Sequence, residues 1–170
     1  GTDVPKMLLS GQKILDDKSV PKPKEDLMRT AFDESVGLSL APGTPQREQA
    51  YQGFKALYVS TAAAKGVRYE AGDDLDKATT QKAIDMITGG ISERGGQKVI
   101  KPYGMTDQVF NKVVDIELEG LAKRTEFPIG QLEDMPLEPV PGKEGVYYLM
   151  NAGRIQVDPK TNEPMIVRVK

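Results

Sequence analysis

The stretch Thr44–Gly66, TPQREQAYQGFKALYVSTAAAKG, decides how the rest of this sequence is expected to fold. Thr44 is a typical N-cap, because its hydroxyl can accept a hydrogen bond from a free amide of the first turn. Pro45 suits the first helical position, where a missing N–H costs nothing. Gly66 can end the run in the left-handed conformation. The stretch therefore predicts a central helix over residues 45–65, about 32 Å long.

One face of this predicted helix is apolar at the three-and-four spacing of an amphipathic helix. Its members are Ala50, Phe54, Leu57, Thr61 and Ala64. Tyr51 and Tyr58 flank that face and widen it. For the aromatic stripe of Tyr51, Phe54 and Tyr58, core packing with the phenol groups reaching solvent is the default expectation. A platform for a carbohydrate or a protein partner is the alternative.

The composition excludes several classes of function. The 170 residues favour one domain, with two small domains as the alternative. The absence of cysteine and histidine removes thiol nucleophiles, the usual zinc ligands and the commonest general base. We find no basic patch that would indicate nucleic-acid binding, no run long enough to span a membrane, and no signal peptide. Because tryptophan is absent and aromatic residues are sparse, we expect an aliphatic, alanine-rich core.

Further helices are expected on both sides of the central one. Residues 4–15 and 24–36 carry helical patterns before it, and Gly11 should weaken the first by about 1 kcal/mol relative to alanine. After it, a helix capped by Asp74 or Asp76 should end near Thr88, and one capped by Thr106 should run to about residue 122. Between them, two short runs around Gly95-Gly96 predict a hairpin over residues 91–100.

The last third of the chain changes character. Four prolines interrupt residues 125–142, which predicts an extended linker or a strap lying on the surface. Residues 143–170 contain the strand-like runs VYYLM, RIQV and MIVRV, separated by turn sequences at 151–153 and 158–162. We expect a helical domain over 1–124 and a three-stranded antiparallel meander packed on it. The predicted fold class is α+β, predominantly helical, with four to five helices and a small C-terminal sheet.

Two motifs resemble ligand-binding loops and fail their templates. The stretch GISERGGQK at 90–98 is a near miss for a phosphate-binding loop, since Gly96 occupies the position of the required lysine. A hairpin turn that needs glycines is the better explanation. Asp73, Asp74 and Asp76 suggest a calcium loop, but Thr79 replaces the glycine that such a loop needs. Helix capping is the favoured interpretation of these aspartates.

Candidate catalytic residues are also weak. Glu48 and Glu70 could be imagined as a glycosidase pair, although 25 acidic residues will yield such pairs by chance. Ser39 lies in GLSLA, which lacks the second glycine of a nucleophile elbow, and no histidine could activate it. A Ser-Lys arrangement stays formally open, but the lysines have the pattern of ordinary surface residues. We therefore predict no catalytic residue, no cofactor and no metal site. The candidate interaction surface consists of the tyrosines Tyr51, Tyr58, Tyr103 and Tyr147.

Four stretches together resemble the C-terminal region of large virion-associated proteins of tailed bacteriophages and prophages. They are LLSGQKIL, AFDESVG, ITGG followed by KPYGMTDQVF, and YYLMNAGRIQVDPKTNEPMIVRV. The resemblance covers about residues 8–169. It implies an internal or tail-associated component that enters the host envelope during DNA delivery. Many such polypeptides carry a lytic transglycosylase domain elsewhere, with a catalytic glutamate in a Glu-Ser type motif.

Here Glu34-Ser35 occurs without the flanking pattern of that motif, so no catalytic role is transferred to Glu34. The resemblance implies a non-catalytic structural module, and the start at Gly1 suggests a piece of a larger polypeptide. Expected partners are other virion proteins or the rest of its own polypeptide. The expected location is the virion, or the bacterial cytoplasm when expressed from a prophage. The alternative is a peptidoglycan-directed glycosidase, or its cell-wall-binding accessory domain, with peptidoglycan as the partner.

Overall fold

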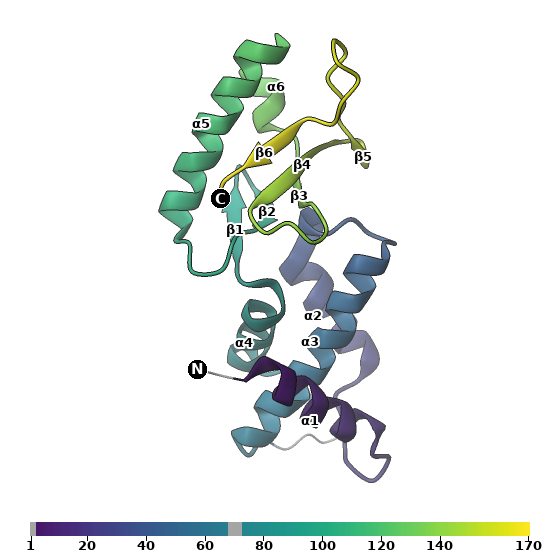
Figure 1. Cartoon of the computed structure of the whole chain (residues 1–170). Helices are drawn as coiled ribbons and strands as arrows, with labels where there is room; N and C mark the ends of the chain where they lie inside the picture. Colours follow the sequence, from purple (N-terminus) through teal and green to yellow (C-terminus); the bar gives the residue numbers. More distant parts are fainter. Residues whose placement is uncertain (1–2, 68–72) are drawn as a thin grey trace. The chain divides into compact units, whose positions relative to one another are not determined.

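The computed structural model describes residues 3–67 and 73–170 and has the α+β fold that the sequence predicts (Figure 1). All five expected helices are present. The helices and the short 3-10 turn are α1 Val4–Asp16, α2 Glu25–Val36, η1 Gly37–Ser39, α3 Pro45–Ala64, α4 Lys77–Thr88, α5 Asp107–Thr125 and α6 Ile129–Glu133. The strands are β1 Ile91–Arg94, β2 Gln97–Ile100, β3 Leu137–Pro139, β4 Val146–Asn151, β5 Arg154–Ile155 and β6 Ile166–Arg168.

The chain divides into two compact units. Unit 1 comprises Gly1–Ser35 and Pro45–Gly90, and unit 2 comprises Val36–Thr44 and Ile91–Lys170. This division differs from the expected helical domain over 1–124. The reason is α5, whose buried side chains belong to one apolar cluster with the C-terminal strands. A helix groups with the elements that bury its apolar face, so α5 falls in unit 2.

Helix α3 is the centre of unit 1, as the sequence predicts. It contacts α1 and α4, and its aromatic side chains contact Phe32 of α2. Because neighbours lie on several sides, residues 56–62 are all buried rather than one face alone. The predicted face is confirmed at Phe54, Leu57 and Thr61, whereas Ala64 is exposed at the C-terminal end of the helix.

The core of unit 1 contains four aromatic side chains beside its aliphatic residues and alanines, so the expectation of an aliphatic, alanine-rich core holds only in part. The rings of Phe32 and Tyr51 meet edge to face with centroids 5.3 Å apart, and those of Phe54 and Tyr58 lie 6.1 Å apart. All four side chains are fully buried. The chain has few aromatic residues, but four of them gather where α2 meets α3, which overall composition could not show.

Helices α1 and α3 approach each other closely at Gly11, which is buried. A Cβ atom placed on Gly11 would lie 1.8 Å from the carbonyl oxygen of Ala56 in α3. No side chain tolerates such a distance, so only glycine permits this packing. The same glycine that weakens α1 in isolation is therefore what lets α1 dock.

The hairpin expected around Gly95-Gly96 is confirmed in unit 2. Strands β1 and β2 pair antiparallel, with Ile91 opposite Ile100 and Arg94 opposite Gln97. The two linking glycines have φ angles of 54° and 81°. Positive φ at both positions of a two-residue loop matches the right-handed twist of the strands, and glycine adopts it without steric cost.

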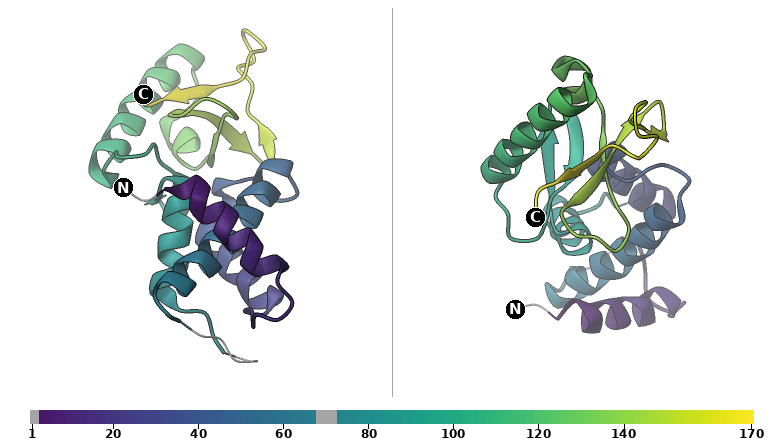
Figure 2. Two further views of the ribbon diagram at one scale, coloured as in Figure 1. Left: turned by 60° about the horizontal axis from the view of Figure 1, so that its bottom comes forward. Right: turned by 45° about the horizontal axis from the view of Figure 1, so that its top comes forward.

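The C-terminal sheet is built around β4. Strand β3 pairs with one side of β4, and β5 follows β4 through the expected tight turn. Strand β6 also returns to β4, where Val167 lies opposite Tyr147. The sheet is antiparallel as predicted, and β3 adds a strand from the proline-rich stretch. The turned views in Figure 2 show α5 running alongside the strands of unit 2.

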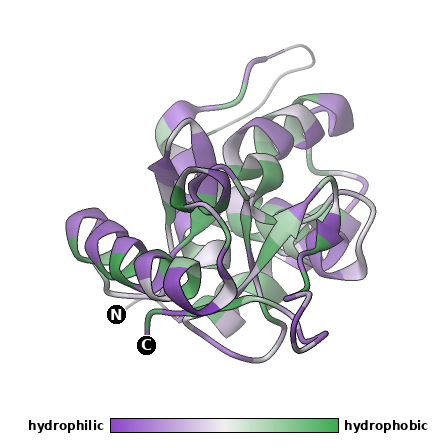
Figure 3. Ribbon diagram, turned by 90° about the horizontal axis from the view of Figure 1, so that it is seen from above, coloured by the Kyte–Doolittle hydropathy of each residue, from purple (hydrophilic) through white to green (hydrophobic). Residues whose placement is uncertain are grey.

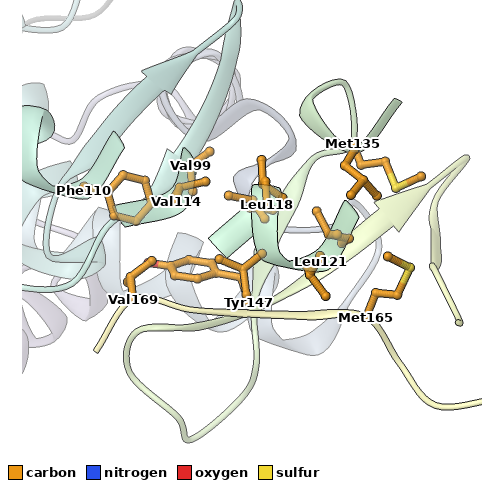
Figure 4. Packing of buried hydrophobic residues seen from close by; sticks show 13 residues of the cluster. Val99, Phe110, Val114, Leu118, Leu121, Met135, Tyr147, Met165 and Val169 are labelled. Carbon is orange, nitrogen blue, oxygen red and sulfur yellow. The ribbon is translucent and has the colours of Figure 1, made fainter. Parts of the chain in front are cut away.

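The proline-rich residues 125–142 are not the surface strap that their composition suggests. They form α6 and β3, and Leu132, Met135 and Leu137 are buried in the main cluster of unit 2. Figure 4 shows Met135 among the side chains of this cluster. Pro128 lies just before α6 and so costs no helical hydrogen bond. Pro139 faces Tyr147 across a strand pair, where edge positions tolerate a missing N–H. Proline position, not proline content, decides the structure here.

We expect Leu132→Ala to destabilise the protein by about 2–5 kcal/mol, because it opens a cavity in a core where Leu132 is fully buried. If residues 125–142 were a surface strap, the same substitution would lower the free energy of unfolding by no more than about 0.5 kcal/mol. Urea unfolding followed by circular dichroism at 222 nm measures the difference. Gln131→Ala at the exposed neighbouring position is the control, and equal effects of the two substitutions would contradict this packing.

Hydropathy agrees with these assignments. The helices alternate hydrophilic and hydrophobic residues along their length, as amphipathic helices do (Figure 3). In the described part of the chain, no helix combines the length and the apolar character required to cross a membrane.

Candidate functional site

The four tyrosines of the predicted interaction surface do not share a surface. Tyr51 and Tyr58 are fully buried in unit 1, and Tyr147 is buried in unit 2 with 2% of its side chain exposed. Only Tyr103 is exposed, at 84%. Core packing, the default expectation for Tyr51 and Tyr58, is confirmed, but the phenol groups do not reach solvent, because each buried phenol has a hydrogen-bond partner inside the protein. That pairing is what allows burial.

Tyr51 holds α2 against α3 through its ring and its hydroxyl. The guanidinium carbon of Arg29 lies 3.6 Å from the ring centroid, and the Nζ atom of Lys55 lies 4.9 Å from it. The hydroxyl donates a 2.6 Å hydrogen bond to Oε1 of Glu25. Burial, and secondly this bond to Glu25, raise the pKa of Tyr51 well above its ordinary value. The phenol therefore stays protonated and structural.

Tyr58 and Tyr147 also connect separate segments of the chain through hydrogen bonds of their hydroxyls. The hydroxyl of Tyr58 accepts a 2.9 Å hydrogen bond from the backbone N–H of Asp76, just before α4 begins. The hydroxyl of Tyr147 donates to the carbonyl oxygen of Ile100 in β2, which ties β4 to the β1–β2 hairpin. Its ring meets Phe110 edge to face at 5.8 Å (Figure 4). Burial, and secondly the charge of Glu144, raise the pKa of Tyr147.

An open polar groove of about 450 Å³ lies where the β1–β2 hairpin meets α5 and α6. The side chains that line it are those of Glu93, Arg94, Gln97, Asn111, Asp115, Glu133 and Asp134. Four carboxylates thus face one guanidinium. This groove was not predicted, because its residues come from three separate segments. One of them, GISERGGQK, was interpreted only as a hairpin turn.

The polar groups of the groove bind one another. Arg94 donates to the carbonyl oxygen and to Oδ1 of Asn111 at 3.1 Å, and to Oδ1 of Asp115 at 2.7 Å. Its side chain is only 17% exposed, so this cation is largely committed to α5. Gln97 donates to the carbonyl oxygen of Asp134 at 2.8 Å. Among the described residues, no cluster of three or more acidic side chains is arranged so that it could hold a metal ion.

The weak catalytic candidates from the sequence are engaged elsewhere. Ser39 is completely buried, and its hydroxyl donates to the carbonyl oxygen of Val36. Glu48 forms an ion pair with Arg29 at 3.1 Å and also accepts from Gln52. Hydrogen bonding to Arg29 lowers the pKa of Glu48, which is opposite to what a general acid requires. Glu70 lies outside the described residues.

The capping interpretation of the aspartate cluster is confirmed at Asp76. Its carboxylate accepts hydrogen bonds from the hydroxyl and the backbone N–H of Thr79, at 2.5 and 2.9 Å. These bonds lower the pKa of Asp76 and satisfy a free amide at the start of α4.

Comparisons of the chain with protein-family models, with curated proteins and with solved structures find no match.

Proposed function

We propose that this chain is a non-catalytic structural module of a phage or prophage virion protein. In this proposal it belongs to a larger polypeptide that takes part in particle assembly or in DNA delivery across the host envelope. Its partners are other virion proteins or the rest of its own polypeptide. It acts in the virion, and it is found in the bacterial cytoplasm when expressed from a prophage.

The observation that supports the non-catalytic part of the proposal is the set of hydrogen bonds inside the groove of unit 2. A catalytic groove needs free groups with matched acid and base roles, usually with shifted pKa values. Here Arg94 is bound to Asn111 and Asp115, and Gln97 is bound to Asp134, so these groups join the hairpin, α5 and α6. Every carboxyl pKa that shifts among the described residues is lowered, at Asp17, Glu48, Asp76 and Asp107.

The edges of the C-terminal sheet are consistent with a role in binding protein. Leu149 donates to Met165, and Val169 donates to Gly145, so alternation turns the N–H and C=O groups of Ile166 and Arg168 away from β4. Such groups can pair with a strand from a partner. On β3, Pro139 has no N–H to offer at the corresponding edge.

Activity on peptidoglycan separates the proposal from its main rival. We expect no clearing of a suspension of purified cell walls by the intact chain, measured as turbidity over hours. Variants with Glu34, Glu48 and Glu70 each changed to Gln accompany it as matched controls. Clearing by the unmodified chain that one of these variants abolishes would establish the glycosidase instead, and sedimentation with the walls without clearing would favour the binding module.

A direct test looks for the protein in particles. Phage particles induced from a strain that carries the gene are purified on a density gradient and analysed by mass spectrometry. We expect peptides of this chain to sediment with the capsid proteins. Peptides found only in the soluble fraction of the lysate would overturn the virion proposal.

A further inference from the structure

The outer face of α5 carries apolar side chains that are exposed to solvent among the residues the structure describes. Val109 and Ile116, two helical turns apart, are 49% and 58% exposed. Val113 and Gly120 continue the same stripe at helical spacing. Val113 is partly buried against the core, and a Cβ on Gly120 would meet only the end of the Arg124 side chain. We call these four residues the α5 stripe.

Two opposite charges border the α5 stripe on one side. Lys112 lies one turn before Ile116, and Glu119 lies almost one turn after it, both exposed to solvent. Among the described residues, neither takes part in an ion pair. Two other charged residues of α5 do form ion pairs within the chain: Asp107 binds Lys101, and Asp115 binds Arg94. The border charges of the stripe are therefore available to an outside partner.

We propose that the α5 stripe binds the α5 stripe of a second copy of this chain, with the two helices antiparallel. A two-fold axis at Ile116 would place the two Ile116 side chains together. The same axis brings Lys112 of each copy beside Glu119 of the other, and Val113 beside the gap that Gly120 leaves. This symmetric contact is isologous, as in most homodimers. In a parallel pair, opposite edges of the stripe would face each other, so Lys112 would lie beside the Val113 edge of the partner and away from its Glu119. The two charges therefore pair only in the antiparallel arrangement. The inference does not depend on the virion proposal.

Cross-linking through a single cysteine tests the axis, because the natural sequence contains no cysteine. We expect Ile116→Cys to form a disulfide-linked dimer under mild oxidation, since residues at the axis face each other across the contact. Leu9→Cys in α1 is the matched control, an exposed apolar helical position at 69% exposure outside the stripe. Equal dimer yields from the two variants would overturn the proposal.

Charge reversal tests the register. Sedimentation equilibrium over a range of concentrations should show a monomer–dimer equilibrium for the unmodified chain. We expect Lys112→Glu or Glu119→Lys alone to weaken the dimer about tenfold by bringing like charges together. The double variant exchanges the two charges and should restore the original affinity, while Ile116→Glu should give monomers only.

A chain that remains monomeric at all concentrations would overturn the proposal and leave the stripe to a different polypeptide. A dimer that the double variant fails to restore would overturn the antiparallel register. Circular dichroism at 222 nm accompanies each variant, so that loss of the dimer is measured only on folded protein.

Discussion

Gly11→Ala is expected to destabilise the protein by about 3 kcal/mol, although alanine favours a helix by about 1 kcal/mol over glycine. The added Cβ would lie 1.8 Å from the carbonyl oxygen and 2.5 Å from the carbonyl carbon of Ala56. These are backbone atoms in the middle of α3, which cannot rotate aside as a side chain can. Helix α1 must therefore move away from α3, and the packing of its half-buried residues is lost.

If α1 detaches while the rest of the protein stays folded, the loss of stability is limited to the packing of α1. Hydrogen exchange should show lost protection in residues 4–16 of the variant, with the amides of unit 2 unchanged. Gly130→Ala is the control, since a Cβ there meets no atom within 4 Å. In urea unfolding, Gly130→Ala should be at least as stable as the unmodified protein. If Gly11→Ala also raised stability, the close crossing of α1 and α3 would be refuted.

Local signals explain what could be predicted from the sequence. Asp76 and Thr106 cap α4 and α5, and each accepts a bond from the amide three residues later. Gly89 ends α4 in the left-handed conformation. These features depend on neighbouring residues alone, so single-sequence reasoning found them. The hairpin at Gly95-Gly96 follows for the same reason, because its loop length and residue type determine the turn.

Contacts between distant segments explain what could not be predicted. The phenol group of Tyr58 is buried, not at the surface, because its hydroxyl meets the backbone of Asp76, and that of Tyr147 because its hydroxyl meets Ile100. No periodicity within either element shows that such a partner exists. Glu138 in the proline-rich stretch likewise accepts a bond from the amide of Ala41, 97 residues earlier. The groove around Arg94 was not predicted for the same reason, since its residues come from distant segments. The predicted surface of four tyrosines does not exist, because three of them are buried.

Tyr147→Ala is expected to cost about 3–5 kcal/mol, because it removes a large buried ring from the core of unit 2. The ring contacts Phe110, and its hydroxyl is the donor to the Ile100 carbonyl. Tyr147→Phe keeps the ring and loses only the hydroxyl, so we expect it to lower the free energy of unfolding by about 1 kcal/mol. Comparing the two by urea unfolding separates packing from hydrogen bonding. Similar losses for both variants would mean that the bond, not the ring, carries the stability.

The same pair of variants makes a prediction for alkaline pH. Burial raises the pKa of Tyr147 above its ordinary value of 10.0, so the folded protein keeps the phenol proton that the unfolded chain releases. This contribution to stability is complete below a pH of about 10 and is lost progressively above it. The unmodified protein should therefore lose stability between pH 8 and 11 more steeply than Tyr147→Phe. The difference between their free energies of unfolding should become smaller over this range. Tyr103→Phe at the exposed ring is the control and should follow the unmodified protein. A gap that stays constant from pH 8 to 11 would show that the Tyr147 proton is not linked to folding.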